Sequence, residues 1–288
     1  MESRIQKKHK NSNFRNAMRR FMRNRTAVVA TVILAIMILL AVFADVITQY
    51  GYEEMDTAAA LQGPTLKHWF GTDNFGRDLF SRVLYGGRIS LVVGFVSVGI
   101  GCLFGCCFGA IAGYRGGKVD MIIMRILDVF QAIPSLLMAI SISAMLGTGI
   151  INCMLAVGIT GIPKYARITR ASVMSIKETE YIEAARAIGE NDAAIILRHL
   201  IPNSLAPIIV QATLGLASGI LSCASLSFIG LGVLPPTPEW GSILSAAKDY
   251  IYGSLHFIMF PGIAIVLAIV TMNLIGDGLR DALDPRLK

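Results

Sequence analysis

The chain has 288 residues, of which 54% are hydrophobic and only 16% charged, and its mean hydropathy is +0.62. Soluble globular domains carry roughly 25% charged residues, so the composition excludes an ordinary soluble protein and predicts an integral membrane protein. The formal net charge is +7, which we interpret as the result of membrane topology and not as a nucleic-acid-binding surface.

The first 26 residues form a basic segment with nine Lys and Arg residues. The uncharged run Ala27–Ala44 follows it, and a helix needs about 20 apolar residues to cross a bilayer. No Ala-x-Ala-like cleavage site ends this run, so it does not read as a signal peptide. We therefore predict an uncleaved transmembrane anchor over residues 27–47.

Residues 48–88 are predicted to form an extracytoplasmic loop. A Gly-rich turn over Phe70–Gly76 precedes a short amphipathic pattern of apolar residues that begins at Leu79. The same segment carries charges of both signs, and these could contact a substrate or form pairs that fix the loop. We favour the second use, which is the more common one. These charged residues are Asp73, Arg77, Asp78 and Arg82.

Residues 89–278 are predicted to form a core of five membrane-spanning helices. Its uncharged runs are Ile89–Tyr114, Val129–Pro163, Leu200–Pro238 and Tyr250–Gly276. The second of these is long enough for more than one span, with the turn Gly147-Thr148-Gly149 separating a span over Met121–Leu146 from the next. With the anchor, this gives six spans in an all-α fold.

The distribution of basic residues predicts the orientation, because Lys and Arg accumulate on the cytoplasmic side of span ends. Placing the amino terminus in the cytoplasm puts 20 of the 26 Lys and Arg residues in cytoplasmic segments. The tail, residues 279–288, then also lies in the cytoplasm.

Two patterns inside the spans have more than one interpretation. Glycines recur every fourth residue in the second span, which lets a neighbouring backbone approach closely, either within the chain or in a partner. They are Gly101, Gly105, Gly109 and Gly113. Arg125 and Asp128 could form an ion or substrate site, but their i, i+3 spacing favours a structural ion pair. The five cysteines show no metal-binding spacing and are interpreted as packing residues.

A charged segment at about residues 174–203 interrupts the hydrophobic pattern. Thr179 can cap a helix over Glu180–Ile188, and Gly189 suits the position just after its end. Asn191 or Asp192 can cap a second helix, which Pro202 is expected to end. The sequence thus predicts two short helices outside the membrane.

The first of these helices carries an apolar stripe at helical spacing, formed by Tyr181, Ala184, Ala185 and Ile188. Alanine lets another surface approach the helix backbone closely, which suits a helix laid into a groove of a partner protein. Glu183 stands off the stripe and is available for a charge-assisted contact. The alternative is a helix resting on lipid headgroups, but a narrow, alanine-based stripe offers little area to anchor there.

This segment closely resembles the signature of permease subunits of ATP-binding-cassette importers. That signature is Glu-Ala-Ala, three residues, Gly, nine residues, then Ile-x-Leu-Pro, and Glu183-Ala184-Ala185, Gly189 and Pro202 match it at the right spacing. His199 stands in place of Ile, and Ile201 in place of Leu. The pattern Arg-His-x-x-Pro-Asn is similar to the peptide and nickel branch of the family.

Further motifs extend the resemblance from about residue 20 to the end of the chain, and they are similar to those of the second permease in dipeptide and oligopeptide importers. They include Phe70-Gly71-Thr72-Asp73, Gly113-Tyr114-Arg115-Gly116-Gly117, Ser227-Phe228-Ile229-Gly230-Leu231-Gly232, Pro238-Glu239-Trp240-Gly241 and Gly276-Asp277-Gly278-Leu279-Arg280-Asp281.

The resemblance implies a type I importer permease that carries di- or oligopeptides, or a related small solute such as a nickel complex, across a bacterial or archaeal cytoplasmic membrane. It implies a second homologous permease, two ATPase subunits that bind ATP and Mg²⁺, and an extracytoplasmic solute-binding protein. The residues implied to couple to the ATPase are Tyr181, Glu183, Ala184, Ala185, Ile188, Gly189 and Pro202. No cofactor is expected in this chain, whose nearest approach to a phosphate loop, Ala112–Val119, lacks the first Gly and the Ser or Thr.

Two alternatives belong to other classes of protein. An ion-coupled secondary transporter would place ionisable residues near the bilayer midplane, and the last three spans carry essentially no carboxylate. An intramembrane enzyme would need paired catalytic residues at membrane depth, and the sequence offers no such pair or catalytic motif.

Overall fold

The computed structural model describes residues 15–283, and this part of the chain is built from helices, with one isolated antiparallel bridge between Thr72 and Asp78. The all-α class is confirmed. After a helical segment at 15–23, the elements are α2 (Arg25–Val42), α3 (Ala44–Ile47), η1 (Thr57–Ala59), α4 (Leu79–Arg115), α5 (Gly117–Ala132), α6 (Ser135–Leu146), α7 (Ile150–Ile176), α8 (Glu180–Ala187), α9 (Asp192–Ala194), η2 (Ile195–Leu200), α10 (Ile201–Asn203), α11 (Leu205–Phe228), α12 (Trp240–Ala247), η3 (Lys248–Tyr250) and α13 (Leu255–Leu283).

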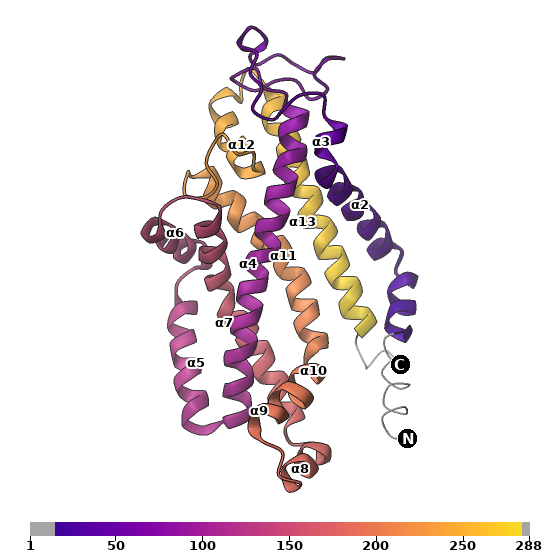
Figure 1. The fold of residues 1–288 in the computed structure, drawn as a ribbon, viewed down its shortest axis with the longest axis vertical. Coiled ribbons are helices and arrows are strands. Elements are labelled where there is room, and N and C mark those ends of the chain that lie inside the picture. Colours follow the sequence, from indigo (N-terminus) through magenta and orange to yellow (C-terminus); the bar gives the residue numbers. More distant parts are fainter. Residues whose placement is uncertain (1–14, 284–288) are drawn as a thin grey trace.

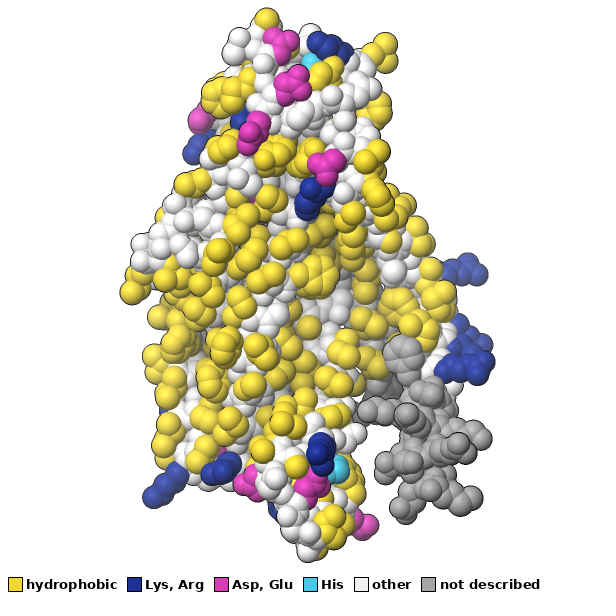
Figure 2. All heavy atoms as spheres, in the orientation of Figure 1, with side chains coloured by type: hydrophobic (Ala, Val, Ile, Leu, Met, Phe, Trp, Pro, Cys, Tyr) yellow, Lys and Arg dark blue, Asp and Glu magenta, His cyan; other side chains and the backbone are white. Residues whose placement is uncertain are grey.

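The long helices run side by side along the longest axis of the molecule, with α8 at one end and residues 48–78, the cap, at the other (Figure 1). The middle of the face shown in Figure 2 is almost wholly hydrophobic, and charged side chains gather toward its two ends. Helices α2, α4, α11 and α13 are long and apolar enough to cross a membrane, and α5 with α6 could make a fifth span. The fourth expected span corresponds to α7, which is not among these helices and whose second half carries Lys164, Arg167 and Arg170.

The third expected span is not one continuous helix. Helices α5 and α6 meet at an angle of 91°. Ile133, which precedes Pro134, has extended backbone angles (φ −90°, ψ 131°), because the proline ring disfavours the helical conformation at the residue before it. The segment Met121–Leu146, expected to form one span, is therefore broken at Pro134 into two helices.

Other helix ends also differ from the expected ones. Helix α4 begins at Leu79, inside the expected loop, because the Asp78 carboxylate accepts a hydrogen bond from the Ser81 amide at 2.8 Å and caps the helix there. Helix α7 continues past Pro163 to Ile176. Helix α11 ends at Phe228, well before the two prolines expected to stop it, and α13 continues into the expected tail as far as Leu283.

The glycine stripe of α4 packs within the chain, against α7. A Cβ atom at Gly105 would lie 2.6 Å from the Tyr165 Cβ, and one at Gly109 would lie 2.3 Å from the Ala166 carbonyl oxygen. Both separations are shorter than real Cβ contacts allow, so only glycine permits this approach of the two helices. The choice between internal and intermolecular packing, which the sequence leaves open, is thus decided in favour of internal packing.

The charges of the cap fix its own chain, as expected. The Asp73 carboxylate accepts hydrogen bonds from the amides of Phe75 and Arg77 at 2.8 and 3.0 Å and from the Arg77 guanidinium at 2.6 Å. The Arg82 guanidinium lies 3.4 Å from the same carboxylate and donates to the Tyr52 carbonyl at 2.9 Å. These buried contacts tie the cap to the start of α4.

The expected pair of Arg125 with Asp128 is replaced by a contact between helices. Asp128 on α5 accepts a hydrogen bond at 2.5 Å from Arg167 on α7. One turn further along α7, Arg170 makes two hydrogen bonds to Asp120 of α5 at 2.5 and 2.6 Å. A bidentate arginine–carboxylate pair fixes direction as well as distance, so these contacts hold α5 beside α7.

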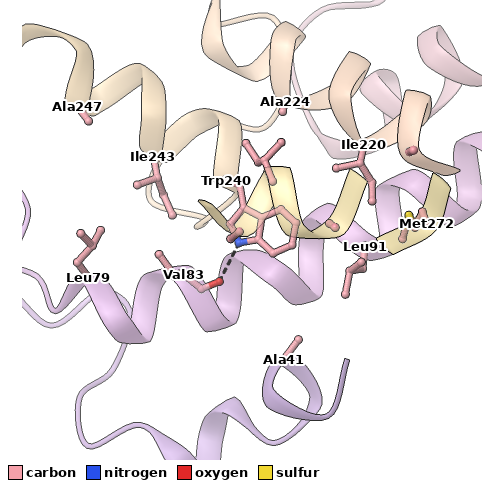
Figure 3. Packing of buried hydrophobic residues seen from close by; sticks show 14 of the residues in the cluster. Ala41, Leu79, Val83, Leu91, Ile220, Ala224, Trp240, Ile243, Ala247 and Met272 are labelled. Carbon is pink, nitrogen blue, oxygen red and sulfur yellow. Dashed lines mark hydrogen bonds between the residues drawn. The ribbon is translucent and has the colours of Figure 1, made fainter. Parts of the chain in front are cut away.

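Helix α12 is pinned to α4 by the largest apolar cluster of the described chain. The Trp240 indole nitrogen donates to the Val83 carbonyl at 2.9 Å, and the ring lies among Leu91, Ile220 and Ile243 (Figure 3). The buried Glu239 carboxylate caps α12 and accepts a hydrogen bond from Ser90 of α4 at 3.0 Å. The motif Pro238-Glu239-Trp240-Gly241 therefore has a structural use.

We expect Gly109→Ala to lower the thermal unfolding temperature of the purified protein, because the added methyl group would collide with the backbone of α7. Overpacking of this kind costs about 1–3 kcal/mol. Gly99→Ala on the same helix is the matched control, since nothing lies within 4 Å of a Cβ built there. Equal melting temperatures for the two variants would contradict the assignment of the stripe to α4–α7 packing.

Candidate functional site

The charged segment between α7 and α11 forms a compact projection at one end of the molecule (Figure 1). Helix α8 begins after Thr179, whose backbone is extended as at a helix N-cap. The Thr179 hydroxyl does not cap the helix and instead donates to the Ile176 carbonyl at 2.6 Å. The expected start of the helix is thus confirmed, while the expected side-chain cap is absent.

Gly189 ends α8 as expected. It has a φ of +82°, a conformation that is costly for most residues other than glycine. The Gly189 amide donates to the Arg186 carbonyl at 3.0 Å, and the Glu190 amide donates to the Ala185 carbonyl at 3.1 Å. This pair of hydrogen bonds is the Schellman arrangement of a helix end, and it fixes the direction in which the chain leaves α8.

The second half of the segment is capped by Asn191, whose side chain accepts a hydrogen bond from the Ala194 amide at 2.8 Å. The chain then stays wound through α9, η2 and α10, so Pro202 does not end this helix as expected. The turn η2, directly before Pro202, is a π-helix. Its wider winding accommodates a proline, which lacks an N–H and crowds the carbonyl four residues back.

The structure does not keep the expected apolar stripe of α8 on one face. Of its four residues only Ala185 is buried, and it shares the buried face with Ile182, which was not part of the stripe. Ile182 (0% exposed) and Ala185 (6% exposed) are buried in a cluster of this chain's own residues. The other members of that cluster are Ala110 of α4, Val173 of α7, and Ile195 and Leu200 of η2. Ala185 therefore packs inside this chain and is not part of an outer surface.

The remaining residues of the stripe lie on the outside of α8. Tyr181 is 45% exposed and Ile188 is 82% exposed, and Ala184 and Glu183 are also exposed. We call Tyr181, Glu183, Ala184 and Ile188 the outer face of α8. Figure 2 shows acidic and hydrophobic side chains next to each other at this tip of the molecule.

Polar contacts hold α8 and α9 against the end of α4. The Tyr114 hydroxyl donates to Asp192 at 2.8 Å, and the Arg186 guanidinium lies over the Tyr114 ring, 5.1 Å from its centre. Arg115 lies 3.6 Å from Asp192. The contact of the Arg186 cation with the Tyr114 ring adds to the packing of α8 against α4.

A second set of contacts joins the two halves of the projection. His199 lies 2.8 Å from Glu190, and the Asn203 side chain donates to the Tyr181 hydroxyl at 3.3 Å. The turn that contains Pro202 is therefore brought close to the start of α8. Helix α8, which carries the outer face, thus packs against α4, α7 and the turn that leads into α11.

Sequence reasoning missed the residues that do this mounting, chiefly Ile182, Tyr114 and Asp192. One sequence signal for the buried face was available: Ile182 is apolar and lies three residues before Ala185, so the two can share a face of α8. Their burial could not be read from spacing, since both faces of α8 contain apolar residues. The partners in α4 lie far away in the sequence and carry no local signal.

The fold defines the chain as an all-α membrane protein with several spanning helices. The family described as binding-protein-dependent transport system inner membrane component matches residues 105–288, and the N-terminal TM domain of oligopeptide transport permease C matches residues 12–64. The chain belongs to this family of permease subunits of ATP-binding-cassette importers and is a transport subunit rather than an enzyme. The ion-coupled and enzymatic alternatives are thereby set aside.

Relatives match over nearly the whole chain. The dipeptide transport system permease protein DppC of Alkalihalophilus pseudofirmus is 47% identical, with 96% of this chain and 91% of that protein covered. The glutathione transport system permease protein GsiD of Pectobacterium atrosepticum is 44% identical, with 96% and 92% covered. Permeases of this kind work with ATPase and solute-binding subunits.

Solved structures support the fold. A chain of the MetNI methionine ABC transporter, in an inward-facing conformation, superposes with a TM-score of 0.57 at 20% identity, covering 70% of this chain and 96% of that one. A second crystal form of the same transporter gives a TM-score of 0.56 at 21% identity.

We expect Ile182→Ala to loosen α8 from the rest of the chain, since it empties a fully buried position. Large-to-small changes of this kind cost about 2–5 kcal/mol. Hydrogen exchange of the α8 amides measures the effect and should become faster. Ile188→Ala makes the same chemical change at an exposed position and should leave exchange unchanged; equal exchange in both variants would contradict the burial described here.

Proposed function

We propose that this chain is one of two homologous permeases in an importer for di- or oligopeptides, or for a related small solute such as a nickel complex. The observation that carries the proposal is the near full-length similarity to permeases named for dipeptide and glutathione transport, both of which are small peptides. The complete transporter then contains a second permease, two ATPase subunits and an extracytoplasmic solute-binding protein.

The outer face of α8 is the docking site for an ATPase subunit in this proposal. Tyr181, Ala184 and Ile188 supply the apolar contact, and Glu183 supplies a charge at its margin. Ala185, Gly189 and Pro202 act from within, by packing α8 on its scaffold and setting its end. ATP and Mg²⁺ are bound by the ATPase subunits.

The mounting of α8 suggests how ATP binding moves the membrane helices. When two ATPase subunits close on ATP, each carries its docked helix with it. Ile182 packs α8 in one cluster with Val173 of α7 and Ala110 of α4, and Leu200 of the same cluster lies just before α11. Packed interiors transmit displacement because they contain few voids. A shift of α8 therefore moves α4, α7 and α11 together and switches the side to which the pathway opens.

The distribution of charge supports an orientation in the bacterial or archaeal cytoplasmic membrane. Arg115, Lys118, Lys177, Arg186 and Arg198 lie at or near the end of the molecule that carries α8, and the positive-inside rule assigns such an end to the cytoplasm. Both termini then lie in the cytoplasm. The cap lies outside, where a solute-binding protein delivers its cargo.

Reconstitution of the complete transporter tests this function. The chain is co-expressed with its partners, purified, and placed in proteoliposomes with the solute-binding protein. We expect uptake of a labelled dipeptide that requires ATP and does not respond to an ion gradient. Uptake driven by a proton or sodium gradient without ATP would refute the proposal.

We expect Ala184→Leu to release the ATPase subunits during purification, because a larger side chain on the outer face overfills the groove that receives it. The melting temperature of the permease should not change, since Ala184 is exposed. Ala185→Leu should show the opposite pattern, a lower melting temperature by overpacking worth about 1–3 kcal/mol. Undiminished co-purification with Ala184→Leu would contradict the assigned docking face.

A further inference from the structure

A half-open cavity of about 210 Å³ lies between α4, α6, α7 and α11, away from the projection that carries α8. Its wall is polar, since half of the residues that line it carry a hydroxyl group and one carries an ammonium group. Prominent among them are Ser97, Thr160, Lys164, Tyr165, Ser218 and Ser222. At about 30 Å³ per water molecule the volume holds several waters, so the cavity is a wet site along the membrane helices.

Lys164 is the one cation among the residues that line the cavity. It lies near the middle of α7, about 21 Å from Ile150 and about 18 Å from Ile176 at roughly 1.5 Å per residue. A charge at such a depth is costly unless it faces water or an opposite charge. Its neighbours Arg167 and Arg170 are paired with Asp128 and Asp120, whereas no carboxylate within the described chain pairs with Lys164.

Two further features of the wall concern hydroxyl groups that face the cavity. The Ser97 side chain is 2% exposed and lines the cavity, yet its hydroxyl has no hydrogen-bond partner among the described residues. A buried hydroxyl without a partner is costly. Gly215 faces the Tyr165 hydroxyl so closely that a Cβ there would lie 2.2 Å from its oxygen; glycine leaves room for that hydroxyl at the wall.

We propose that this cavity holds the solute while it crosses the membrane, and that the Lys164 ammonium pairs with a carboxylate of the solute. This inference rests on the proposed function and adds to it a ligand chemistry. The ligand class is a small solute with a carboxylate and amide groups, such as a peptide with a free carboxyl terminus. Hydroxyl groups both donate and accept hydrogen bonds, so the serines and the threonine can contact peptide amides in either direction without selecting a side chain.

The test uses the complete transporter in proteoliposomes with its solute-binding protein and a labelled dipeptide that has a free carboxylate. Lys164→Gln should lower ATP-driven uptake about tenfold or more, because a charge-assisted contact is lost. Lys164→Arg keeps the charge and should remain within about threefold of the unmodified transporter. Lys118→Gln removes an exposed lysine of α5 and should change nothing.

ATP hydrolysis without peptide is measured in parallel, and all rates are normalised to intact complex. We expect basal hydrolysis to be the same for every variant, which places the defect in solute passage and not in assembly. Unchanged uptake by Lys164→Gln, or an equal defect in Lys164→Arg, would overturn the inference while leaving the proposed function intact. An unmodified transporter that imports no peptide with ATP would overturn the proposed function, and the inference with it.

Discussion

The close approach of α4 and α7 positions both the projection that carries α8 and the polar cavity. Gly105 and Gly109 contribute no side-chain atom to the contact, so that the backbone of α4 meets the backbone and the Cβ atoms of α7. One end of this helix pair carries the cluster of Ala110 and Val173 that seats α8. Its middle supplies Ser97 and Lys164 to the polar cavity. A shift of either helix would therefore change both the cluster that holds α8 and the polar cavity.

In the proposed function, this arrangement couples the docking surface on α8 to a membrane cavity without a separate linkage. Helix α8 is fixed through Ile182 and through the contacts of Tyr114 with Asp192 and Arg186. Close-packed interiors transmit strain because voids are few, so a rigidly mounted helix passes on displacement that a flexible loop would absorb. The paired charges between α5 and α7 hold a third helix in the same unit. A transport subunit that performs no chemistry itself needs this stiffness.

Two sets of polar side chains on α4, α5 and α7 differ in how they are satisfied within the described residues. Asp120, Asp128, Arg167 and Arg170 satisfy one another between α5 and α7 and stabilise the fold. Lys164 and Ser97 lack such partners among the described residues and face a shared cavity. An unpaired polar group away from water is destabilising. The ion pairs between α5 and α7 satisfy one another, whereas Lys164 and Ser97 are satisfied by water or, in the inference above, by the solute.

The all-α membrane class, the family and the start of α8 could be predicted from the sequence, because hydropathy, the Glu-Ala-Ala signature and the turn preference of Gly189 are local properties. It also indicated that the charges of the cap would fix the cap. Three features emerge only from contacts in the folded chain: Ala185 faces inward and Ala184 outward, Asp128 pairs with Arg167 and not Arg125, and helices α5 and α6 meet at a sharp angle. The pairing and the burial depend on which distant residues meet, and although Pro134 marks the break locally, the 91° angle between α5 and α6 does not follow from the sequence pattern. Spacing along one chain does not encode those contacts.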